Sequence, residues 1–476
     1  MHDYLHHYIN GQWTASTGSE KLAVKNPATE EVIGHISAGT EEDLDKAVRA
    51  ARKAFPRFSQ TTREYRVDLL ERIAEEYAKR KDDLTKVITE ELGAPRALSE
   101  KVHYTMGYNH FKQAAEELRH FTFVEKRAAS TIVKEPIGVS GLITPWNFPT
   151  NQTSTKIASA LAAGSTMVLK PAEITPYAAM MLVDIFEAAG VPEGVFNLVN
   201  GTGETVGNAI SSHSDIDIVS YTGSGTAGSQ VMKNASENIK KVALELGGKS
   251  PLVVLDDADV TEAAQIAVNN IANNTGQVCT AATRVIIPAK MKAAFEEAMK
   301  KATEELKVGD PTADNQLGPL VAEKQWDTVQ GYIQKGMDEG ATVLTGGTGK
   351  PEGLKSGYFA KPTVFTDVDN DMTIAQEEIF GPVTTLITYD SLEEAIDIAN
   401  DTIYGLAGYV VGKDEEKLQK VALNIRAGRI VINGASADFS APFGGYKHSG
   451  IGREWGDFGI EEYLEVKSVL GMSSDE

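Results

Sequence analysis

Cysteine is almost absent from this sequence: Cys279 is the single cysteine in 476 residues. A lone cysteine excludes an internal disulfide framework and a cysteine-rich zinc site, and it is typical of a protein from a reducing compartment. Long apolar runs are also missing, because no stretch approaches the ~18 consecutive apolar residues of a membrane span. Residues 1–8 show neither the basic nor the apolar segment of a secretory signal. We therefore expect a cytoplasmic protein.

Basic residues are in short supply as well. Lysine and arginine together number 46, against 67 aspartates and glutamates, so the formal net charge is −21. A surface of that sign repels nucleic-acid backbones and anionic lipids, so we expect neither nucleic acid nor a membrane as a partner. His2, His6 and His7 could suggest a metal site, but histidines near a terminus are more simply a solvated tail. No metal is expected.

The pattern of apolar residues predicts an α/β protein. The chain is too long for one ordinary hydrophobic core, so two or three domains are expected. Helical patterns fill most of residues 40–120, and from residue 131 short β-rich runs alternate with helices, which predicts parallel strands covered on both faces. The strands are expected at 137–143, 166–169, 195–199 and 216–221, and in a second series at 252–255, 285–287, 341–344 and 383–387.

Local signals add detail to this pattern. The dipeptide Asn10-Gly11 predicts the turn of a hairpin. A capping-box pattern that begins at Thr61 predicts a helix start. Thr175-Pro176 predicts an N-cap followed by the first residue of another helix.

Two glycine-rich turns follow expected strands. Residues 201–207 form G-x-G-x-x-x-G, one residue longer than the usual dinucleotide-binding fingerprint, and residues 223–228 form the fingerprint G-x-G-x-x-G itself. Glycines let backbone N–H groups approach a pyrophosphate at a helix N-terminus, so two such turns favour a dinucleotide. The fingerprint asks for an acidic ribose ligand about 20 residues further on, and counting from Gly223 reaches Glu245.

The lone cysteine follows a helical pattern at 259–274. Gly276 is expected to end that helix, which places Cys279 on the connection beyond it. A thiolate in such a place can attack the carbonyl carbon of a substrate. The alternative is an inert, buried cysteine that behaves as a small hydrophobe. This stretch alone leaves both interpretations open.

Seven motifs occur along the chain in an order that is shared by one enzyme family. They are P-W-N-F-P at 145–149, K-P-A-E at 170–173, Y-T-G-S at 221–224, L-E-L-G-G-K at 244–249, G-Q-V-C at 276–279, E-E-I-F-G-P at 377–382 and P-F-G-G-Y-K-H-S-G at 442–450. With them the chain resembles the NAD(P)-dependent aldehyde dehydrogenase superfamily over nearly its whole length.

The resemblance implies a fold of three parts. A Rossmann-type nucleotide-binding domain is expected at 1–117 and 137–247, and an α/β catalytic domain at 248–446. A small β oligomerisation arm at 118–136 would join a C-terminal segment at 447–476. Relatives use this arm to extend a neighbour's sheet, so a homodimer or homotetramer is expected.

The resemblance also implies the chemistry. Cys279 would attack an aldehyde, the Asn147 amide and the Cys279 backbone N–H would stabilise the oxyanion, and Glu245 would activate water to hydrolyse the thioester. This role for Glu245 replaces the ribose role reached by counting. Lys156 and Glu454 match a proton relay to that base, and an ordinary salt bridge is the alternative for this pair.

NAD is the cofactor that the resemblance implies. Lys170 and Glu173 match the adenosine-ribose ligands, and because a carboxylate there would repel a 2′-phosphate, NADP is the less favoured cofactor. The other cofactor positions implied by the family are Ile143, Trp146, Gly203, Gly207, Gly223, Ser224, Glu378 and Phe380.

The chain departs from the family where the substrate tunnel is expected. Relatives that accept apolar aldehydes place large apolar residues after Asn-Phe-Pro, whereas Thr150, Asn151, Gln152 and Thr153 follow here. A polar tunnel would favour a small or hydroxylated aldehyde. The tunnel residues expected are Phe148, Asn151, Gln152, Thr155 and Phe443.

Three other functions stay open. One is a semialdehyde or CoA-acylating enzyme that passes the acyl group to a thiol, although such relatives commonly lack the glutamate at position 245. A second is a cofactor-free cysteine hydrolase that uses His213 or His448 as its base. The third is a catalytically silent relative, against which the intact Cys279, Glu245 and Asn147 argue.

Overall fold

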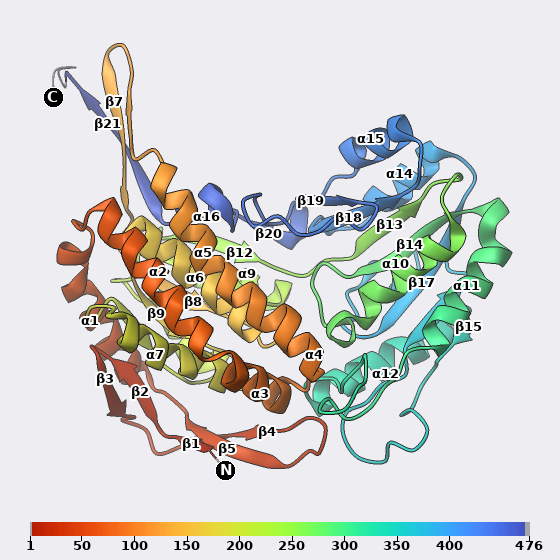
Figure 1. The fold of residues 1–476 in the computed structure, drawn as a ribbon, viewed down its shortest axis with the longest axis horizontal. Helices are drawn as coiled ribbons and strands as arrows, with labels where there is room; N and C mark the ends of the chain where they lie inside the picture. The colour runs from red at the N-terminus through yellow and green to blue at the C-terminus, as the bar shows by residue number, and fades with distance from the viewer. Residues whose placement is uncertain (1, 472–476) are drawn as a thin grey trace.

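The computed structural model describes residues 2–471, in which two large β-sheets lie at the centres of two lobes (Figure 1). The first sheet has eight strands in the order β20-β12-β11-β8-β9-β10-β2-β3. Its five middle strands run parallel, and antiparallel pairs close both sides. The strands are β2 (His6–Ile9), β3 (Gln12–Ala15), β8 (Val139–Ile143), β9 (Thr166–Lys170), β10 (Phe196–Leu198), β11 (Ile218–Thr222), β12 (Lys241–Glu245) and β20 (Gly450–Ile451).

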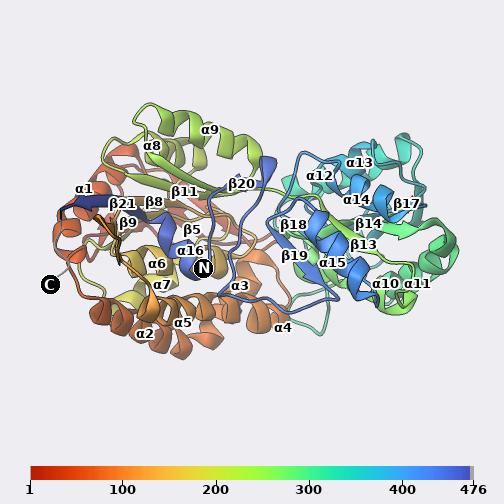
Figure 2. The ribbon, with the colours of Figure 1, turned by 90° about the horizontal axis from the view of Figure 1, so that it is seen from above.

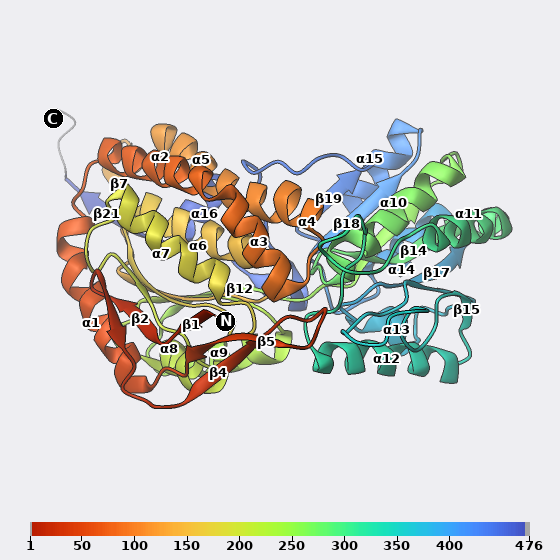
Figure 3. The same ribbon diagram turned by 60° about the horizontal axis from the view of Figure 1, so that its bottom comes forward.

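Helices cover both faces of this sheet, as the alternation of strands and helices predicts (Figures 2 and 3). Successive strand residues point to opposite faces: Met167 and Leu169 pack into one core, and Val168 packs into the other. The first core contains α2 (Arg63–Lys79), α5 (Thr105–His120), α6 (Pro149–Ala163) and α7 (Tyr177–Ala189). The second contains α1 (Glu41–Phe58), α8 (Asn208–Ser212) and α9 (Gly225–Ser236).

Shorter elements join these helices. Between α2 and α5 lie α3 (Lys81–Leu92), α4 (Arg96–Leu98) and the π-helical η1 (Ser99–Tyr104). The π-helical η2 (Gly203–Gly207) leads into α8. A three-stranded sheet of β1 (His2–Tyr4), β5 (Val32–Ser37) and β4 (Lys21–Lys25) was not expected from the sequence.

The N-terminal histidines do not form a solvated tail. Residues 6–9 pair with β3 through the predicted Asn10-Gly11 turn and with β10 on the other side. His7 is completely buried, with Nε2 3.4 Å from the Asp43 carboxylate. The expectation was wrong because strand pairing orders this terminus. Within residues 2–471 no group of three or more histidine, cysteine or acidic side chains could hold a metal ion.

The second large sheet has seven strands in the order β15-β16-β17-β14-β13-β18-β19, all parallel except for the β15–β16 pair. Helices α10 and α11 pack on one face, and α14 and α15 pack on the other. The strands are β13 (Ser250–Val254), β14 (Ala282–Pro288), β15 (Thr342–Thr345), β16 (Thr363–Thr366), β17 (Val383–Tyr389), β18 (Ala407–Val411) and β19 (Arg429–Ile432). The helices of this part are α10 (Val260–Ala272), η3 (Asn273–Gly276), η4 (Ala289–Met291), α11 (Lys292–Glu304), α12 (Glu323–Asp338), α13 (Thr373–Gln376), α14 (Leu392–Asn400) and α15 (Glu415–Asn424).

An arm of three antiparallel strands projects from the first lobe (Figure 1). It consists of β6 (Val124–Lys126) and β7 (Ser130–Pro136), with β21 (Leu464–Leu470) paired to β7 along its whole length. The short η5 (Lys447–Ser449) and α16 (Gly456–Glu462) precede β21. Residues 472–476 of the expected C-terminal segment lie outside the described residues. The domain boundaries themselves stay a prediction.

Two expected helix caps differ from those observed. The cap of α2 is Thr62, one residue after the capping box that was predicted at Thr61. Thr175 does not cap α7; its first N–H groups, those of Tyr177 and Ala178, donate to the Glu91 carboxylate at 2.7 and 2.9 Å. A distant acidic side chain thus replaces the local cap. Among residues 2–471 no helix is both long and apolar enough to cross a bilayer.

Candidate active site

Cys279 lies between η3 and β14, at the point where two cavities meet. The first, here named the cleft, contains residues 145–147, 222–224, 245–247 and 378–380 in its wall. The second, here named the tunnel, is bounded in part by Phe148, Asn151, Phe443 and Trp455. Cys279 and Gln152 are in the walls of both. A group bound in either cavity therefore reaches the same sulfur.

A left-handed turn sets the position of Cys279. Helix α10 ends at Ala272, earlier than the predicted stop at Gly276, and three successive residues then adopt positive φ: Asn274 (48°), Thr275 (55°) and Gly276 (71°). Non-glycine residues adopt this conformation only at a cost, which buried contacts must offset. A Cβ at Gly276 would lie 2.1 Å from the Gly381 carbonyl oxygen, so only glycine fits.

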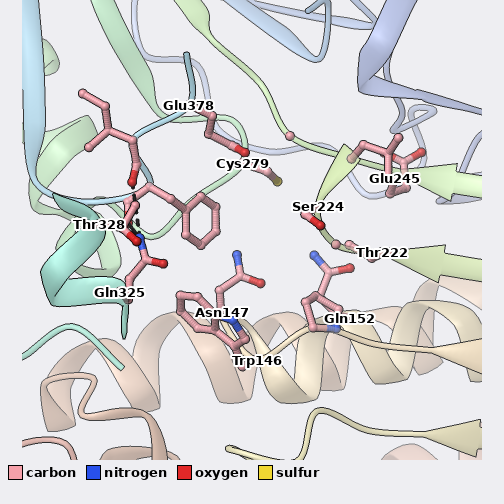
Figure 4. Close-up of a pocket in the computed structure, with 16 residues that line it drawn as sticks. Trp146, Asn147, Gln152, Thr222, Ser224, Glu245, Cys279, Gln325, Thr328 and Glu378 are labelled. Atoms are coloured by element: carbon pink, nitrogen blue, oxygen red, sulfur yellow. Dashed lines mark hydrogen bonds between the residues drawn. The ribbon is translucent and has the colours of Figure 1, made fainter. Parts of the chain in front are cut away.

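The Asn147 amide faces the sulfur and is held in place by the same turn. Its Nδ2 donates to the Gln277 carbonyl at 3.0 Å, while Asn274 Nδ2 donates to the carbonyls of Asn147 at 2.8 Å and Gln277 at 3.3 Å. In Figure 4 the Cys279 sulfur points toward the side-chain amides of Asn147 and Gln152. An amide nitrogen carries two N–H groups, so one of those on Asn147 is left for an oxygen bound at the sulfur.

Glu245, the last residue of β12, brings a buried carboxyl to the wall of the cleft. Burial, and then the negative charge of Glu454, raises the pKa of Glu245 well above its usual value. Its Oε2 has no hydrogen-bond partner. Glu454 accepts from Lys156 Nζ at 2.5 Å, and Lys156 also donates to Ser220 at 2.8 Å. Lys156 thus links Ser220 and Glu454 by hydrogen bonds, and the charges of Glu454 and Lys156 act on Glu245.

The environment of Cys279 favours the neutral thiol over the thiolate. Burial, followed by the nearby carboxylates of Glu378 and Glu245, raises the pKa of the Cys279 thiol far above its usual value. Burial also raises the pKa of Glu378 to about 7. Attack by the sulfur therefore requires that its proton move to a neighbouring base. Glu245 has a raised pKa and lies in the same cleft, so it is suited to accept that proton.

The residues expected to hold a cofactor lie along one edge of the first sheet. Ile143, Lys170 and Thr222 end β8, β9 and β11, which are parallel neighbours in that sheet. The structure brings Trp146, Gly223, Ser224, Glu378 and Phe380 together in the wall of the cleft. Ligands bind at this edge in open α/β sheets.

The remaining cofactor positions lie further along the same edge. Lys170 Nζ donates to Glu173 at 3.1 Å, and the Glu173 side chain is partly exposed. Gly207 lies beside Lys170, where an added Cβ would be 3.9 Å from its Cδ. Nothing lies within 4 Å of such an atom at Gly203. Neither glycine is in the wall of the cleft around Cys279.

The cleft fits a dinucleotide by its shape and its donors. Helix α9 begins at Gly225 beside the cleft, and Ser224 caps it by accepting from Ala227 N at 3.3 Å. The free N–H groups and positive end of such a helix suit a pyrophosphate. A Cβ at Gly247 would lie 2.2 Å from the Glu378 carboxylate, so a side chain there would have to displace the Glu378 carboxylate from its place in the cleft wall.

The tunnel contains four of the five residues expected in it: Phe148, Asn151, Gln152 and Phe443. Thr155 is the exception, because it is buried inside the helix layer and is in the wall of neither cavity. Asn151 Oδ1 lies 2.7 Å from Nε2 of His110, which is itself buried. The cavity measures about 410 Å³, within the range of small-molecule sites.

Sequence reasoning missed several residues of the site. Asn274 orients the Asn147 backbone, and Gln325 Nε2 donates to the Phe380 carbonyl at 2.9 Å and so fixes the cleft wall. Arg429 and Trp455 are in the tunnel wall. Asn274 lies two residues before the G-Q-V-C motif and Trp455 follows Glu454, whereas nothing in the sequence marks Gln325 or Arg429. His213 and His448, the candidate bases of a hydrolase, are in the wall of neither cavity.

Comparison with known proteins decides the family. A model of the aldehyde dehydrogenase family matches residues 13–469. This chain belongs to the aldehyde dehydrogenase family. A Staphylococcus haemolyticus protein named as an aldehyde dehydrogenase is 58% identical over 475 residues and covers 100% of both chains. The protein is therefore an oxidoreductase that acts on the aldehyde group.

Solved structures of aldehyde dehydrogenases have the same fold as this protein. A cysteine-to-alanine variant of aldehyde dehydrogenase C from Pseudomonas syringae, in complex with NAD+ and octanal, has a TM-score of 0.98 at 44% identity and covers 99% of this chain and 97% of its own. Betaine aldehyde dehydrogenase from Staphylococcus aureus, in complex with NAD+, has a TM-score of 0.96 at 39% identity and covers 99% and 96%. The α/β fold with an aldehyde-dehydrogenase arrangement is thus confirmed.

Proposed function

We propose that this aldehyde dehydrogenase uses NAD to oxidise an aldehyde to a carboxylate through a thioester on Cys279. The observation that carries the proposal is the position of one sulfur at the junction of two cavities. The Asn147 amide and the Glu245 carboxyl share the cleft with it. The NAD+ in the solved structures of relatives supports the choice of cofactor.

The first half of the reaction uses Cys279 and Asn147. Glu245 takes the thiol proton, and the sulfur attacks the carbonyl carbon of an aldehyde that lies in the tunnel. The Asn147 Nδ2–H and the Cys279 backbone N–H donate to the oxygen of the resulting thiohemiacetal. NAD bound in the cleft supplies the acceptor for the two electrons and the hydrogen that leave this carbon.

The second half of the reaction uses Glu245 again. The thiol proton first passes from Glu245 to solvent, which restores the carboxylate. Glu245 then removes a proton from a water that attacks the thioester carbon, and the C–S bond breaks to give the carboxylic acid, whose proton returns the departing thiolate to the thiol. The proton then leaves Glu245 through the buried Glu454 and Lys156, whose charges act on Glu245. A structural salt bridge remains the alternative role for that pair.

Glu173 favours NAD over NADP. Its partly exposed carboxylate lies beside Lys170 at the edge where the adenosine ribose is expected. A carboxylate accepts a hydrogen bond from a free 2′-hydroxyl and repels a 2′-phosphate. The single positive charge of Lys170 is already bound to Glu173 and to the Pro171 carbonyl. NADP is therefore the weaker cofactor.

One experiment tests the proposed function directly. An aldehyde panel is screened for nicotinamide reduction with NAD and NADP, using the unaltered protein, Cys279→Ser and Glu245→Gln. Cys279→Ser should abolish turnover, while Glu245→Gln should stop after about one equivalent of reduced cofactor per subunit. Absence of nicotinamide reduction with every aldehyde, or full steady-state turnover by Cys279→Ser, would refute the proposal.

A thiol-acylating reaction is the second candidate function. The presence of Glu245 favours water as the acyl acceptor, so coenzyme A should not accelerate turnover. The polar residues Asn151 and Gln152 in the tunnel support a small or polar aldehyde.

A homodimer or homotetramer built through the arm and a cytoplasmic location complete the proposal.

A further inference from the structure

One cation in the tunnel has no counter-ion. Arg429 is the first residue of β19, is partly buried, and has its side chain in the tunnel wall. Its guanidinium carbon lies 5.7 Å from the centre of the Trp455 ring. No hydrogen bond or ion pair of this side chain to another residue of the described chain is present. A cation on the wall of a small-molecule cavity without an acidic partner is an open binding group.

The rest of the wall leaves this positive charge uncompensated. Apart from Arg429, the only Asp, Glu, Lys or Arg residue in the tunnel wall is Glu454. Its carboxylate is already paired with Lys156, whose Nζ lies 2.5 Å from Glu454 Oε1. The nearby Tyr409 hydroxyl donates to the Thr280 carbonyl at 2.8 Å and offers no negative charge. The tunnel therefore combines a reactive sulfur with one free guanidinium.

We propose that the preferred substrate is an aldehyde with a carboxylate at its other end, which Arg429 binds. This inference rests on the proposed function, because it assigns a ligand to the tunnel that leads to Cys279. A planar guanidinium matches a carboxylate with two parallel N–H···O bonds. One guanidinium also matches one negative charge, so a monoanionic carboxylate is favoured over a phosphate. Arg429 and Cys279 are in the wall of the same cavity, so a carboxylate bound at Arg429 leaves the aldehyde end in the tunnel that contains the sulfur.

The same contact selects against cationic aldehydes. An aromatic ring such as that of Trp455 attracts a quaternary ammonium group through its face. Here the Arg429 guanidinium already lies over that ring and repels a second cation. The tunnel should therefore rank substrates by charge, with anionic aldehydes first, neutral ones next and cationic ones last.

The test compares aldehydes of matched shape and different charge. The pairs are 4-oxobutanoate with its neutral analogue 4-methylpentanal, and betaine aldehyde with 3,3-dimethylbutanal. Nicotinamide reduction is measured for the unaltered protein, Arg429→Ala and Arg429→Lys. The matched control is Arg426→Ala, since Arg426 is exposed and outside the tunnel wall.

Arg429→Ala should lower kcat/KM for 4-oxobutanoate by about 10- to 100-fold, the usual value of a charge-assisted contact. For 4-methylpentanal the change should stay within about threefold, and betaine aldehyde should gain relative to its neutral analogue. Arg429→Lys should retain part of the preference, and Arg426→Ala all of it. Most of the loss should be in KM, whereas a misfolded variant would lose kcat with every aldehyde.

Two failures are distinguishable. If the unaltered protein reduces nicotinamide neither with these four aldehydes nor with any other aldehyde of the panel, the proposed function fails. If it oxidises 4-methylpentanal as well as 4-oxobutanoate, or if Arg429→Ala affects both equally, the carboxylate inference is overturned while the proposed function stands.

Discussion

The position of Glu245 shows how a single carboxyl can serve at neutral pH. A carboxylate at its usual pKa is a weak base, and a buried one without neighbours would hold its proton too firmly. Burial raises the pKa of Glu245 most, the charge of Glu454 raises it further, and Lys156 and Arg453 lower it. The balance of these charges sets the pH at which water can be activated.

This balance predicts a shift in pH dependence. Glu245 is active as a base only when ionised, so thioester hydrolysis should rise with pH through its raised pKa. Glu454→Gln removes a negative charge that raises this pKa and frees Lys156, so the acid limb of the kcat profile should move to lower pH. Single-turnover rates between pH 5 and 9 measure it, with the exposed Glu461→Gln as control. A shift to higher pH would contradict this arrangement.

Motifs predicted the reacting residues but not the residues that hold them in place. Cys279, Asn147 and Glu245 were assigned because short stretches around them resemble a family, and the structure brings all three to one cleft. Arg429 could not be found in this way, because its significance depends on which distant segments form the tunnel and on the lack of an acidic neighbour. Both depend on tertiary packing, which cannot be predicted from local patterns in a single sequence.

At the scale of elements, the turn after α10 controls the site. Gly276 has φ 71° and contacts the Gly381 backbone, so a methyl group there must push the loop that carries Cys279. Gly276→Ala should lower kcat by about 100-fold, since small displacements of a nucleophile cost that much. Gly347→Ala is the matched control, because φ is 91° and the nearest atom to its new Cβ is 3.9 Å away. Equal activity of both variants would contradict the prediction.

The start of α7 depends on a side chain from another helix. Glu91 of α3 accepts from two N–H groups of α7 that would otherwise be buried without partners. Glu91→Ala should therefore reduce the free energy of unfolding by about 2–3 kcal/mol. Urea unfolding measures it, with Glu90→Ala expected to change stability by less than about 0.5 kcal/mol. A loss as small as the control's would show that solvent replaces the cap.

The helices and parallel strands were predictable because their periodicity is local. Strands such as β9 and β11 are buried along their whole length and rich in β-forming residues, and the helices between them carry a regular apolar face. Strands β4 and β5 were missed because their burial is partial and they form an antiparallel pair outside the alternation of strands and helices. The Thr175 cap failed since a distant carboxylate outcompeted the local hydroxyl.

At the scale of the molecule, the order of strands was beyond the sequence. Alternation predicted two parallel series, but which strands are neighbours depends on crossovers that periodicity does not encode. Periodicity likewise did not predict that β2, β3 and β20 add to the first sheet as antiparallel edge strands. The arm was foreseen through the resemblance, and its pairing of β7 with β21 is confirmed.

The projecting arm leads to a prediction about assembly. Strand β21 pairs with β7 on one side only, and Val466 and Leu470 on it are 66% and 78% exposed. Such an edge is a template for pairing with a second chain. Light scattering should give twice or four times the monomer mass of 51.2 kDa.

A charge placed on this edge should weaken the assembly. Val466→Lys adds repulsion and removes apolar surface, so its monomer fraction should rise on dilution. Leu423→Lys is the matched control, because Leu423 is 84% exposed on α15, far along the chain from the arm strands. Chemical cross-linking is a second measurement of whether two arms meet. If Val466→Lys leaves the mass unchanged and no cross-link forms between two arms, assembly does not use this edge. If Leu423→Lys dissociates the protein instead, the interface lies on the second lobe.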